Sequence, residues 1–502
     1  MSRSTITVIP TKSKRVEVPD FAGDYVLKRV VLINHVGKKV DVKFLIQELN
    51  VYESIYKNAV TGTLVIADDG NQIARMSIQG LEKIAFLLKT PGVTTGKEDV
   101  VDASEETGEP FHVYKVSDRK QASPGLMTYT LHFASREFMR NIRTKVSQSY
   151  DDRYDLIVRD ILSDKSYLDS RKKLHYENTG NRNKIVIPNL TPFDAINMIA
   201  KKSISDKTKG VGYYFYETTG GYYFRSWQNM IMNQGRFARK PKQTFYYQPQ
   251  KMGSDSKTTN QTKIERAYQS VEAYEFTNNF HDIATNTLLG TYGHRVISHN
   301  LFDKSYDVHD YNFHDEFAKT PHTDQGDHFP IADTPVDYDN WRKVSDYKES
   351  RVSLQTTSPF LHDKSVGKYG LEPLQDGDNT GKLASQGNQV VLGTALKLTV
   401  KGQSNLQAGD MIEFNLRSVD SGNSQSNPPD PRFSGNYIIT KVRHQVADSQ
   451  YRMVLECAKD SVATKYGGLS RGQSMHGEMN RTSRTYQEEE LDSHITGSQG
   501  SS

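Results

Sequence analysis

The sequence predicts a mainly β protein with α+β parts: two similar antiparallel β-barrel domains, an intervening small α+β domain and a loop-rich insertion. Three observations predict this fold class. Short runs of alternating apolar and polar residues are joined by Gly- and Asp-containing turns, which is typical of hairpin-connected strands. The chain contains 28 Tyr and 20 Phe, and these aromatic residues favour strands. Finally, the phrase EKIAFLLK at 82–89 returns as DMIEFNLR at 410–417.

The bulk composition limits the classes of function. A chain of 502 residues exceeds what one hydrophobic core serves, so several domains are expected. The net charge of +4 from 64 basic and 60 acidic residues is too balanced to make nucleic acid or an anionic membrane the default partner. The single cysteine, Cys457, excludes an intrachain disulfide and suits a reducing compartment. The sequence shows no signal peptide and no apolar run long enough to span a bilayer, so assembly in the cytoplasm is expected.

The first third of the chain is expected to form a polar arm at 1–24 and a first tube-like β-barrel at 25–146. Two β-rich runs lie on either side of a turn at Gly37, and further hairpins follow. Near the end of this region, Ser135 is expected to cap a helix whose apolar face is made by Phe138, Met139, Ile142 and Val146.

Residues 147–240 are expected to form the α+β domain. Residues 154–162 have the spacing of one or two further amphipathic helical turns. Thr191 followed by Pro192 is a helix start, because Thr caps well and Pro suits the first helical position. The pair Gly220 and Gly221 is expected to turn a hairpin between two aromatic strands.

The second barrel is expected to be split. Its parts are assigned to 241–299 and 389–465, because β patterning occurs in SVEAYEFTNN, TNTLLGTYGHRVISH and four later strands. The residues between them, 300–388, are polar and are assigned to a loop-rich inserted domain. The tail at 466–502 has hardly any apolar residues and is expected to be disordered or dependent on a partner.

The two ends of the chain match each other strand by strand. After the quoted phrase, VYKV at 113–116 corresponds to ITKV at 439–442, and the strand ending at Ala134 corresponds to the strand ending at Ala458. Upstream, ELNVYESIYKNAVTGTLVI echoes AYEFTNNFHDIATNTLLGT in rhythm. Two unrelated meanders that converge on common strand patterns are the alternative. The expected strand-core residues of the repeat are Ile84, Phe86, Leu88, Val113, Val116, Leu131, Phe133, Ile412, Phe414, Leu416, Ile439, Val442, Leu455 and Cys457.

A duplicated module has a consequence for assembly. One chain with two similar barrels can place them as neighbours around an axis, and three such chains then make a ring of six. Closed cyclic assemblies are the usual form of homo-oligomers. Such a ring would join a sixfold object to a threefold one.

The residues that carry chemistry elsewhere do not form a convincing catalytic motif. One cluster interleaves imidazole and carboxylate groups, which can bind zinc or iron, but its spacing matches no recognised ligand pattern, so loop or strand positions are expected. Its members are His309, His314, His322, His328, Asp307, Asp310, Asp315, Asp324 and Asp327.

Three other patterns have simpler explanations. The acidic pairs at 105–106 and 151–152 are sequence neighbours and cannot flank a sugar as glycosidase carboxyls do. Ser470 lies in a GxSxG string without the strand and helix that a nucleophile elbow needs. The aromatic run YYFYETTGGYYF is expected to cover a helix and to present tyrosines to a partner rather than to bind nucleic acid.

Taken in order, these features resemble the central baseplate hub proteins of contractile-tailed bacteriophages, which are related to the hub part of type VI secretion spikes. The resemblance rests on the paired barrels, AGDMIEF at 408–414, the closing hairpin NYIITKVRH with YRMVLECA, and TPFDAINMIAKKS followed by an aromatic hairpin. It covers roughly residues 25–465.

The resemblance implies a structural protein of the virion tail baseplate without enzymatic activity or cofactor. It implies a homotrimer with a hexameric tail-tube or tube-initiator ring on one face, a trimeric spike on the other, and baseplate proteins around it. Two alternatives remain open: a virion-associated enzyme that degrades polysaccharide or peptidoglycan, and a carbohydrate- or receptor-binding β protein.

Overall fold

A computed structural model describes most of the chain. The described residues are 19, 21–70, 75–92, 100–106, 108–180, 182–208, 210–232, 240–247, 260–278, 282–300, 304–324, 328–337, 341–357, 382–387, 394–417 and 429–466.

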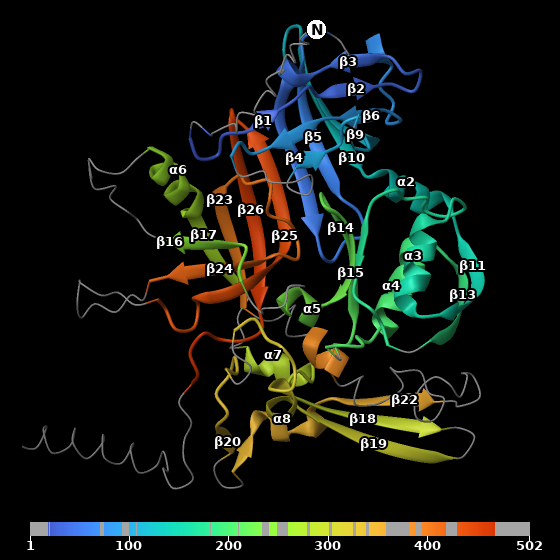
Figure 1. Cartoon of the computed structure of the whole chain (residues 1–502), viewed down its shortest axis with the longest axis vertical. Helices are drawn as coiled ribbons and strands as arrows, with labels where there is room; N and C mark the ends of the chain where they lie inside the picture. The colour runs from blue at the N-terminus through green and yellow to red at the C-terminus, as the bar shows by residue number, and fades with distance from the viewer. Residues whose placement is uncertain are drawn as a thin grey trace, which may run out of the picture.

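One sheet of 13 strands joins the two ends of the chain (Figure 1). We call its N-terminal strands, with their short companions, the first module: β1 (Val26–Leu27), β2 (Val31–Ile33), β3 (Lys39–Asp41), β4 (Ile46–Ser54), β5 (Thr61–Asp68), β6 (Lys83–Ala85), β7 (Leu87–Lys89), β8 (Val101–Asp102), β9 (Phe111–Ser123) and β10 (Leu126–Ala134). The second module contains β16 (Gln243–Tyr247), α6 (Asn260–Gln269), β17 (Val271–Asn278), β23 (Thr394–Lys401), β24 (Met411–Leu416), β25 (Gly435–Ala447) and β26 (Gln450–Lys459).

Five strands of each module pair in the same order. The first module has the order β4-β5-β10-β9-β6, and the second has β17-β23-β26-β25-β24. Every pairing within these sets is antiparallel. In both sets the strands appear along the chain as first, second, fifth, fourth and third, so the same topology is built twice.

Two register irregularities occur at matching places in the two modules, while further shifts in the β9–β10 and β17–β23 pairings have no counterpart. Tyr114 is skipped in the pairing of β9 with β10, and Thr440 is skipped in the pairing of β25 with β26. Gln47 of β4 and Glu272 of β17 are skipped in the same way where each module begins. A bulge adds one residue to one strand at a defined place. Two bulges at matching places favour duplication over independent convergence.

These registers reproduce the alignment expected from the sequence. Leu131 pairs with Val116 as Leu455 pairs with Val442, and Ile84 of β6 occupies the place of Ile412 on β24. The upstream echo holds only in part. β17 takes the place of β4, but the strand equivalent to β5 is β23, which begins at Thr394.

The structure therefore corrects two features of the expected second module. Residues of the stretch TNTLLG, expected as a strand, belong to helix α7 (Ile283–Leu288). β18 (Gly293–Asn300) pairs with β19 and β22 rather than with the large sheet. The pairings of the large sheet run from β17 to β3, with β16 branching from β24. An isolated bridge between Tyr246 of β16 and Ser270, the residue before β17, brings the two ends of the second module together, and closure of either module into a barrel remains a proposal.

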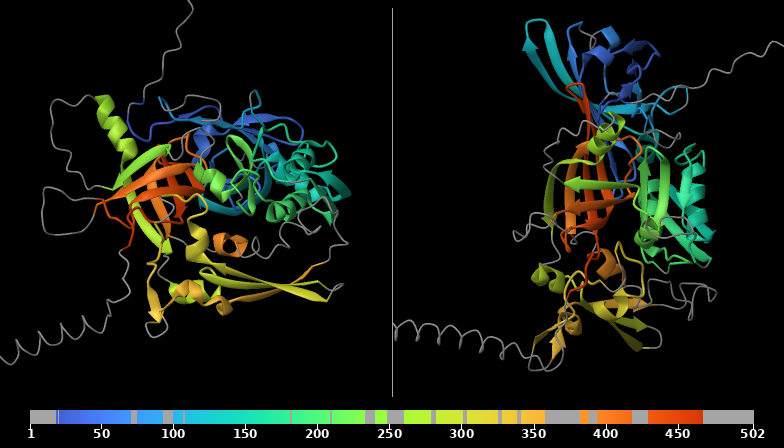
Figure 2. Two further views of the ribbon diagram at one scale, coloured as in Figure 1. Left: turned by 60° about the horizontal axis from the view of Figure 1, so that its bottom comes forward. Right: turned by 60° about the vertical axis from the view of Figure 1, so that its left-hand side comes forward.

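The α+β domain lies beside both modules (Figure 2). Its elements are α2 (Arg136–Arg143), β11 (Val146–Asp152), α3 (Tyr154–Ser163), β12 (Leu174–Tyr176), β13 (Asn183–Leu190), α4 (Pro192–Lys202), β14 (Tyr213–Thr218), β15 (Gly221–Ser226) and α5 (Trp227–Met232). Thr191 caps α4 as expected, since its Oγ1 accepts a hydrogen bond from the Asp194 amide. Helix α2 ends before Val146, which starts β11, and Ile142 is 60% exposed. The expected apolar face of α2 is therefore wrong in these two positions.

The inserted segment forms a separate layer at the bottom of Figure 1. Besides α7 and β18 it contains β19 (Ser305–Asn312), α8 (Phe313–Phe317), β20 (Pro335–Asp337), β21 (Arg342–Lys343), β22 (Val352–Thr357) and 3-10 turns at Val344–Asp346 and Lys348–Ser350. A further 3-10 turn, Lys43–Leu45, precedes β4. No helix in the described part of the chain combines the length and apolar character of a membrane span.

One apolar core runs through both modules. Leu64 and Leu131 of the first module and Leu398 and Leu455 of the second belong to the same buried cluster. Phe414 lies in this cluster with no exposed surface. Since buried apolar area stabilises a fold in proportion to its size, the two modules are expected to unfold together.

Replacement of Phe414 or Ile412 by Asp is expected to prevent folding of the second module. Each change leaves an unpaired charge where the native side chain is fully buried, at a cost of several kcal/mol. Thermal unfolding and soluble yield measure the effect. Val186→Asp is the matched control, because Val186 is 69% exposed. A normal melting temperature for Phe414→Asp would contradict the burial on which the second module depends.

Candidate assembly interface

The two modules meet where β4 pairs with β25. This pairing is antiparallel, with Lys441 opposite Ser54 at one end and Ala447 opposite Glu48 at the other. The first part of β25 instead pairs with β24, Met411 lying opposite Ile438. A single long strand thus completes its own module with one half and holds the neighbouring module with the other.

At this junction, side chains of β25 donate hydrogen bonds to side chains of β4. Arg443 Nη2 donates to Glu48 Oε1 at 2.9 Å, and Arg443 Nε donates to Asn50 Oδ1 at 2.9 Å. Gln445 Nε2 donates to Glu48 Oε1 at 2.7 Å. Partial burial alone would raise the pKa of Glu48, but hydrogen bonds from Asn50 and Gln445 and the charge of Arg443 lower it overall. On this junction β4 supplies acceptors and β25 supplies donors.

A buried polar cluster lies behind the junction. Glu53 of β4 accepts hydrogen bonds from the Thr219 amide at 2.8 Å and the Ala408 amide at 3.1 Å. His444 Nε2 lies 4.0 Å from Glu53 Oε1, and His444 Nδ1 lies 2.7 Å from the Tyr451 hydroxyl. Thr219 belongs to the β14–β15 turn, so this cluster ties the α+β domain to both modules.

Burial perturbs the two titratable groups of this cluster in opposite directions. Burial raises the pKa of Glu53 to about 7, although the two backbone amides oppose the shift. Burial lowers the pKa of His444 to about 4. Around neutral pH the histidine is therefore neutral, while Glu53 is close to half-protonated.

A second buried charge cluster fixes the α+β domain on the first module. Lys172 Nζ lies 2.8 Å from Glu137 Oε2 and 2.6 Å from Glu217 Oε1. The other oxygen of Glu217 accepts a hydrogen bond from the Val60 amide at 2.8 Å. These contacts join α2, β14 and the first module, so they attach the domain to the sheet.

Two strand edges equivalent to the junction remain open. From Lys115 onward, β9 pairs only with β10 among the described residues. In the described part of the chain β17 pairs along its length only with β23 and ends the large sheet. By the module equivalence, β9 corresponds to β25 and β17 corresponds to β4. The two kinds of edge that meet inside the chain thus recur, unmatched, on its surface.

The expected strand-core residues of the repeat lie in or against the apolar core that the two modules share. Val116 and Leu416 are partly buried and pack against the common cluster. The remaining residues of the set are buried: Ile84, Phe86, Leu88, Val113, Leu131, Phe133, Ile412, Phe414, Ile439, Val442, Leu455 and Cys457. Burial raises the pKa of Cys457 above its usual range, as suits an enclosed thiol.

The His and Asp residues of the insertion do not converge on one point. His309 lies on β19, while His314 is buried against Ser345, whose hydroxyl is 2.8 Å from Nδ1. His322 Nδ1 lies 2.9 Å from Asp460 Oδ2 and its Nε2 lies 2.6 Å from the Phe317 carbonyl. No group of three or more potential metal ligands occurs among the residues the structure describes. Asp327 lies outside those residues.

His322 and its neighbours instead attach the insertion to the second module. Asp460, just after β26, accepts hydrogen bonds from the Thr323 amide at 2.9 Å and from Trp227 Nε1 at 3.2 Å. Asp324 accepts one from the Asn436 amide at 3.1 Å. These hydrogen bonds hold the insertion against the second module and α5.

The aromatic hairpin differs from its expected role. Tyr213, Phe215, Tyr222 and Phe224 are buried against the helices of the α+β domain. Tyr216 is also fully buried, on the side of the modules. The expectation that the hairpin presents tyrosines to a partner is wrong for these residues. The string around Ser470 lies outside the described residues.

Sequence reasoning missed Glu53 and His444, although a signal for both was present. Glu53 follows Leu49 and Val51 at intervals of two, so it falls on the apolar face of its strand. His444 stands between Val442 and Val446 in the same way. A charged or polar residue in the buried phase of a strand indicates a partner inside the fold.

Comparisons with known proteins find similar solved structures only. No family model and no curated protein matches the chain. A tail protein from Neisseria meningitidis MC58 is 10% identical, with 89% of this chain and 100% of that chain covered and a TM-score of 0.45. The 43 kDa tail protein of prophage MuSo2 from Shewanella oneidensis is 11% identical, with 86% and 99% covered and a TM-score of 0.46.

A third similar structure is an E. coli protein described as a component of the type VI secretion system. It is 8% identical, with 84% of this chain and 75% of that chain covered and a TM-score of 0.39. These neighbours are of the class that the sequence resembles: phage tail proteins and relatives in secretion spikes. Because the TM-scores are below 0.5 and the identities near 10%, what this chain does is inferred below from its own strand pairings.

Glu53→Gln is expected to make stability more acid-sensitive. Because the folded pKa of Glu53 is raised to about 7, its contribution grows as pH falls from 7 to 4.5. Because the folded pKa of His444 is lowered to about 4, its contribution is lost as pH falls from 6.5 to 4. The two slopes, each about 1.4 kcal/mol per pH unit, offset each other between pH 4.5 and 6.5. Without Glu53, the loss of stability caused by protonation of His444 at low pH is no longer offset.

Urea unfolding midpoints at pH 7.5, 6.5, 5.5 and 4.5 measure this difference. His444→Gln is the reciprocal variant and should gain stability over the interval in which Glu53→Gln loses it. Glu456→Gln, at a half-exposed carboxylate of β26, is the control. Parallel pH profiles for all four proteins would show that the two buried groups do not titrate as described.

Proposed function

We propose that this chain is a non-enzymatic structural hub of a contractile-tail baseplate. It forms a homotrimeric ring of six modules, and this ring adapts a hexameric tail tube to a trimeric central spike. The protein assembles in the bacterial host cytoplasm and acts in the virion. The resemblance of the sequence to hub proteins supports the class, and the duplicated module supports the symmetry.

The main supporting observation is that one chain contains a module-to-module junction and leaves the two equivalent strand edges, on β9 and β17, open. A subunit with two different but complementary edges associates head to tail. Head-to-tail association closes into a ring when the rotation between neighbours divides a full turn. Two equivalent modules per chain then give a ring with twice as many lobes as chains.

A ring of three chains fits the proposed role. Six modules present repeated strand surfaces to a sixfold tube ring, while the insertions and α+β domains, present once per chain, keep threefold symmetry. A threefold partner such as a spike would bind those single-copy parts. Surrounding baseplate proteins would contact the outside of the ring.

A non-enzymatic role is supported by the position of the perturbed groups. Glu53 and His444 are 1% exposed, and Cys457 is 1% exposed as well. Functional groups with shifted pKa values normally lie in clefts that a substrate can enter. Here the groups are enclosed at packing junctions, where they hold domains together.

Light scattering of the purified protein is expected to give a mass of about 170 kDa, which corresponds to three chains of 56.9 kDa in a closed ring. The same sample should not clear a suspension of peptidoglycan or capsule polysaccharide. A mass near that of one chain at micromolar concentration, or clear lytic activity, would contradict the proposed hub.

A further inference from the structure

The β4–β25 junction predicts how one copy of the chain binds the next. We infer that the outer edge of β9 pairs, antiparallel, with β17 of a neighbouring copy, and that Lys120 lies opposite Glu275 in that pairing. This inference rests on the proposed ring and names the strands and the register that close it. An open strand edge is a template for another strand, and here the module equivalence says which one.

The register follows by transferring the observed junction onto the open edges. In the junction, Gln445 lies opposite Asn50. On β10, Thr128 pairs with Lys120, as on β26 the equivalent Arg452 pairs with Gln445. On β23, Lys397 pairs with Glu275, as on β5 the equivalent Thr63 pairs with Asn50. Lys120 and Glu275 therefore occupy the places of Gln445 and Asn50.

The chemistry of the two edges matches this placement. In the junction the β4 side accepts hydrogen bonds and the β25 side donates them. On the open edges, β17 carries Glu275 and also Glu272, which already pairs with Lys401, while β9 carries the basic Lys115, Arg119 and Lys120 and one acidic residue, Asp118. The side chain of Glu275 is 65% exposed, and its contact with Lys397 is 3.8 Å long. At the places of Gln445 and Asn50 the donor and acceptor roles persist as the opposite charges of Lys120 and Glu275, whereas Ser117 and Ala273 take the places of Arg443 and Glu48.

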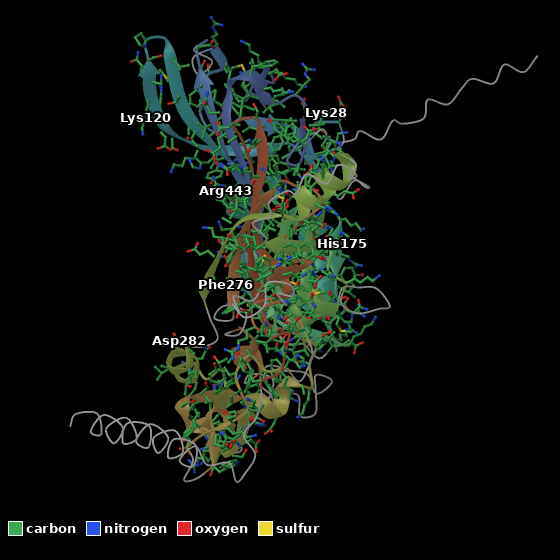
Figure 3. All side chains as sticks on the ribbon, turned by 90° about the vertical axis from the view of Figure 1, so that its left-hand side faces the viewer. Lys28, Lys120, His175, Phe276, Asp282 and Arg443 are labelled. Carbon is green, nitrogen blue, oxygen red and sulfur yellow. The ribbon has the colours of Figure 1, made fainter. Side chains whose placement is uncertain are left out.

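The open edges lie where a neighbour can reach them. The β9–β10 hairpin projects beyond the rest of the molecule at the top of the right-hand view (Figure 2). Figure 3 shows Lys120 on this hairpin, Phe276 on β17 farther down the molecule, and Arg443 of the internal junction between them. Because the two edges lie apart on one chain, each must be completed by a different copy. Such contacts join copies head to tail, and in the proposed trimer they close into a ring.

The inference predicts a disulfide between copies in the double variant Lys120→Cys with Glu275→Cys. Directly opposite residues in antiparallel strands have Cβ atoms about 4.5–5.5 Å apart, close to the separation that a disulfide bridges. After oxidation, non-reducing electrophoresis should show dimers and trimers of covalently joined chains, and a reductant should return them to monomers. Cys457 is buried and does not contribute.

Two controls make this test selective. Each single cysteine variant should give no trimer, and Lys120→Cys combined with Lys207→Cys should not either, because Lys207 lies on an exposed turn of the α+β domain. If wild type has the mass of a trimer but the 120–275 pair does not cross-link, the ring closes through another surface and this inference fails while the proposed hub stands. If wild type is a monomer, both fail.

Charge exchange tests the same pair without cysteine. Lys120→Glu or Glu275→Lys alone places like charges opposite each other and should weaken association roughly two- to fivefold per interface, as measured by the concentration dependence of the mass. The double exchange should restore association. Lys207→Glu makes the same change in net charge as Lys120→Glu and should leave association unaltered. Additive rather than compensating effects of the two exchanges would overturn the pairing of Lys120 with Glu275.

Discussion

The pairing of β4 with β25 is the constraint on which the rest of the structure depends. It merges two modules into one sheet, and it places Glu53 and His444 where they hold the α+β domain. Backbone hydrogen bonds in a sheet fix both the spacing and the register of the strands that they join. The arrangement of the two modules is therefore set by a strand ladder rather than by flexible linkers.

The same ladder explains why a duplicated module is useful. Within one chain, the edge of β25 fits the edge of β4. Because β9 corresponds to β25 and β17 to β4, β9 of one copy can fit β17 of another copy in the same way. Natural proteins usually block such edges, because they promote uncontrolled association. In this chain the two open edges carry opposite charges, and in a closed ring every edge would be covered. In a closed ring, strand edges that could otherwise cause aggregation would direct assembly.

The sequence predicts those parts of the fold that leave a local pattern and misses those that depend on contacts between distant segments. The repeat was visible because Ile84 and Ile412 head similar alternating runs, and helix α4 was visible because Thr191 and Pro192 are strong start signals. The extent of the insertion was not, because TNTLLG has the composition of a strand and its helical state is set by tertiary context. The junction itself was also missed, since pairing between distant strands leaves no local pattern. The one sign of the junction in the sequence is Glu53, a carboxylate on the face of β4 that is otherwise apolar and buried.

A three-dimensional reconstruction of the purified protein by electron microscopy tests the central claim most directly. The account predicts a threefold ring of six similar lobes in which the contact between copies superimposes on the β4–β25 junction, strand for strand. A particle in which the two modules of one chain are related as described, but neighbouring copies meet away from β9 and β17 or do not close around a common axis, would contradict it.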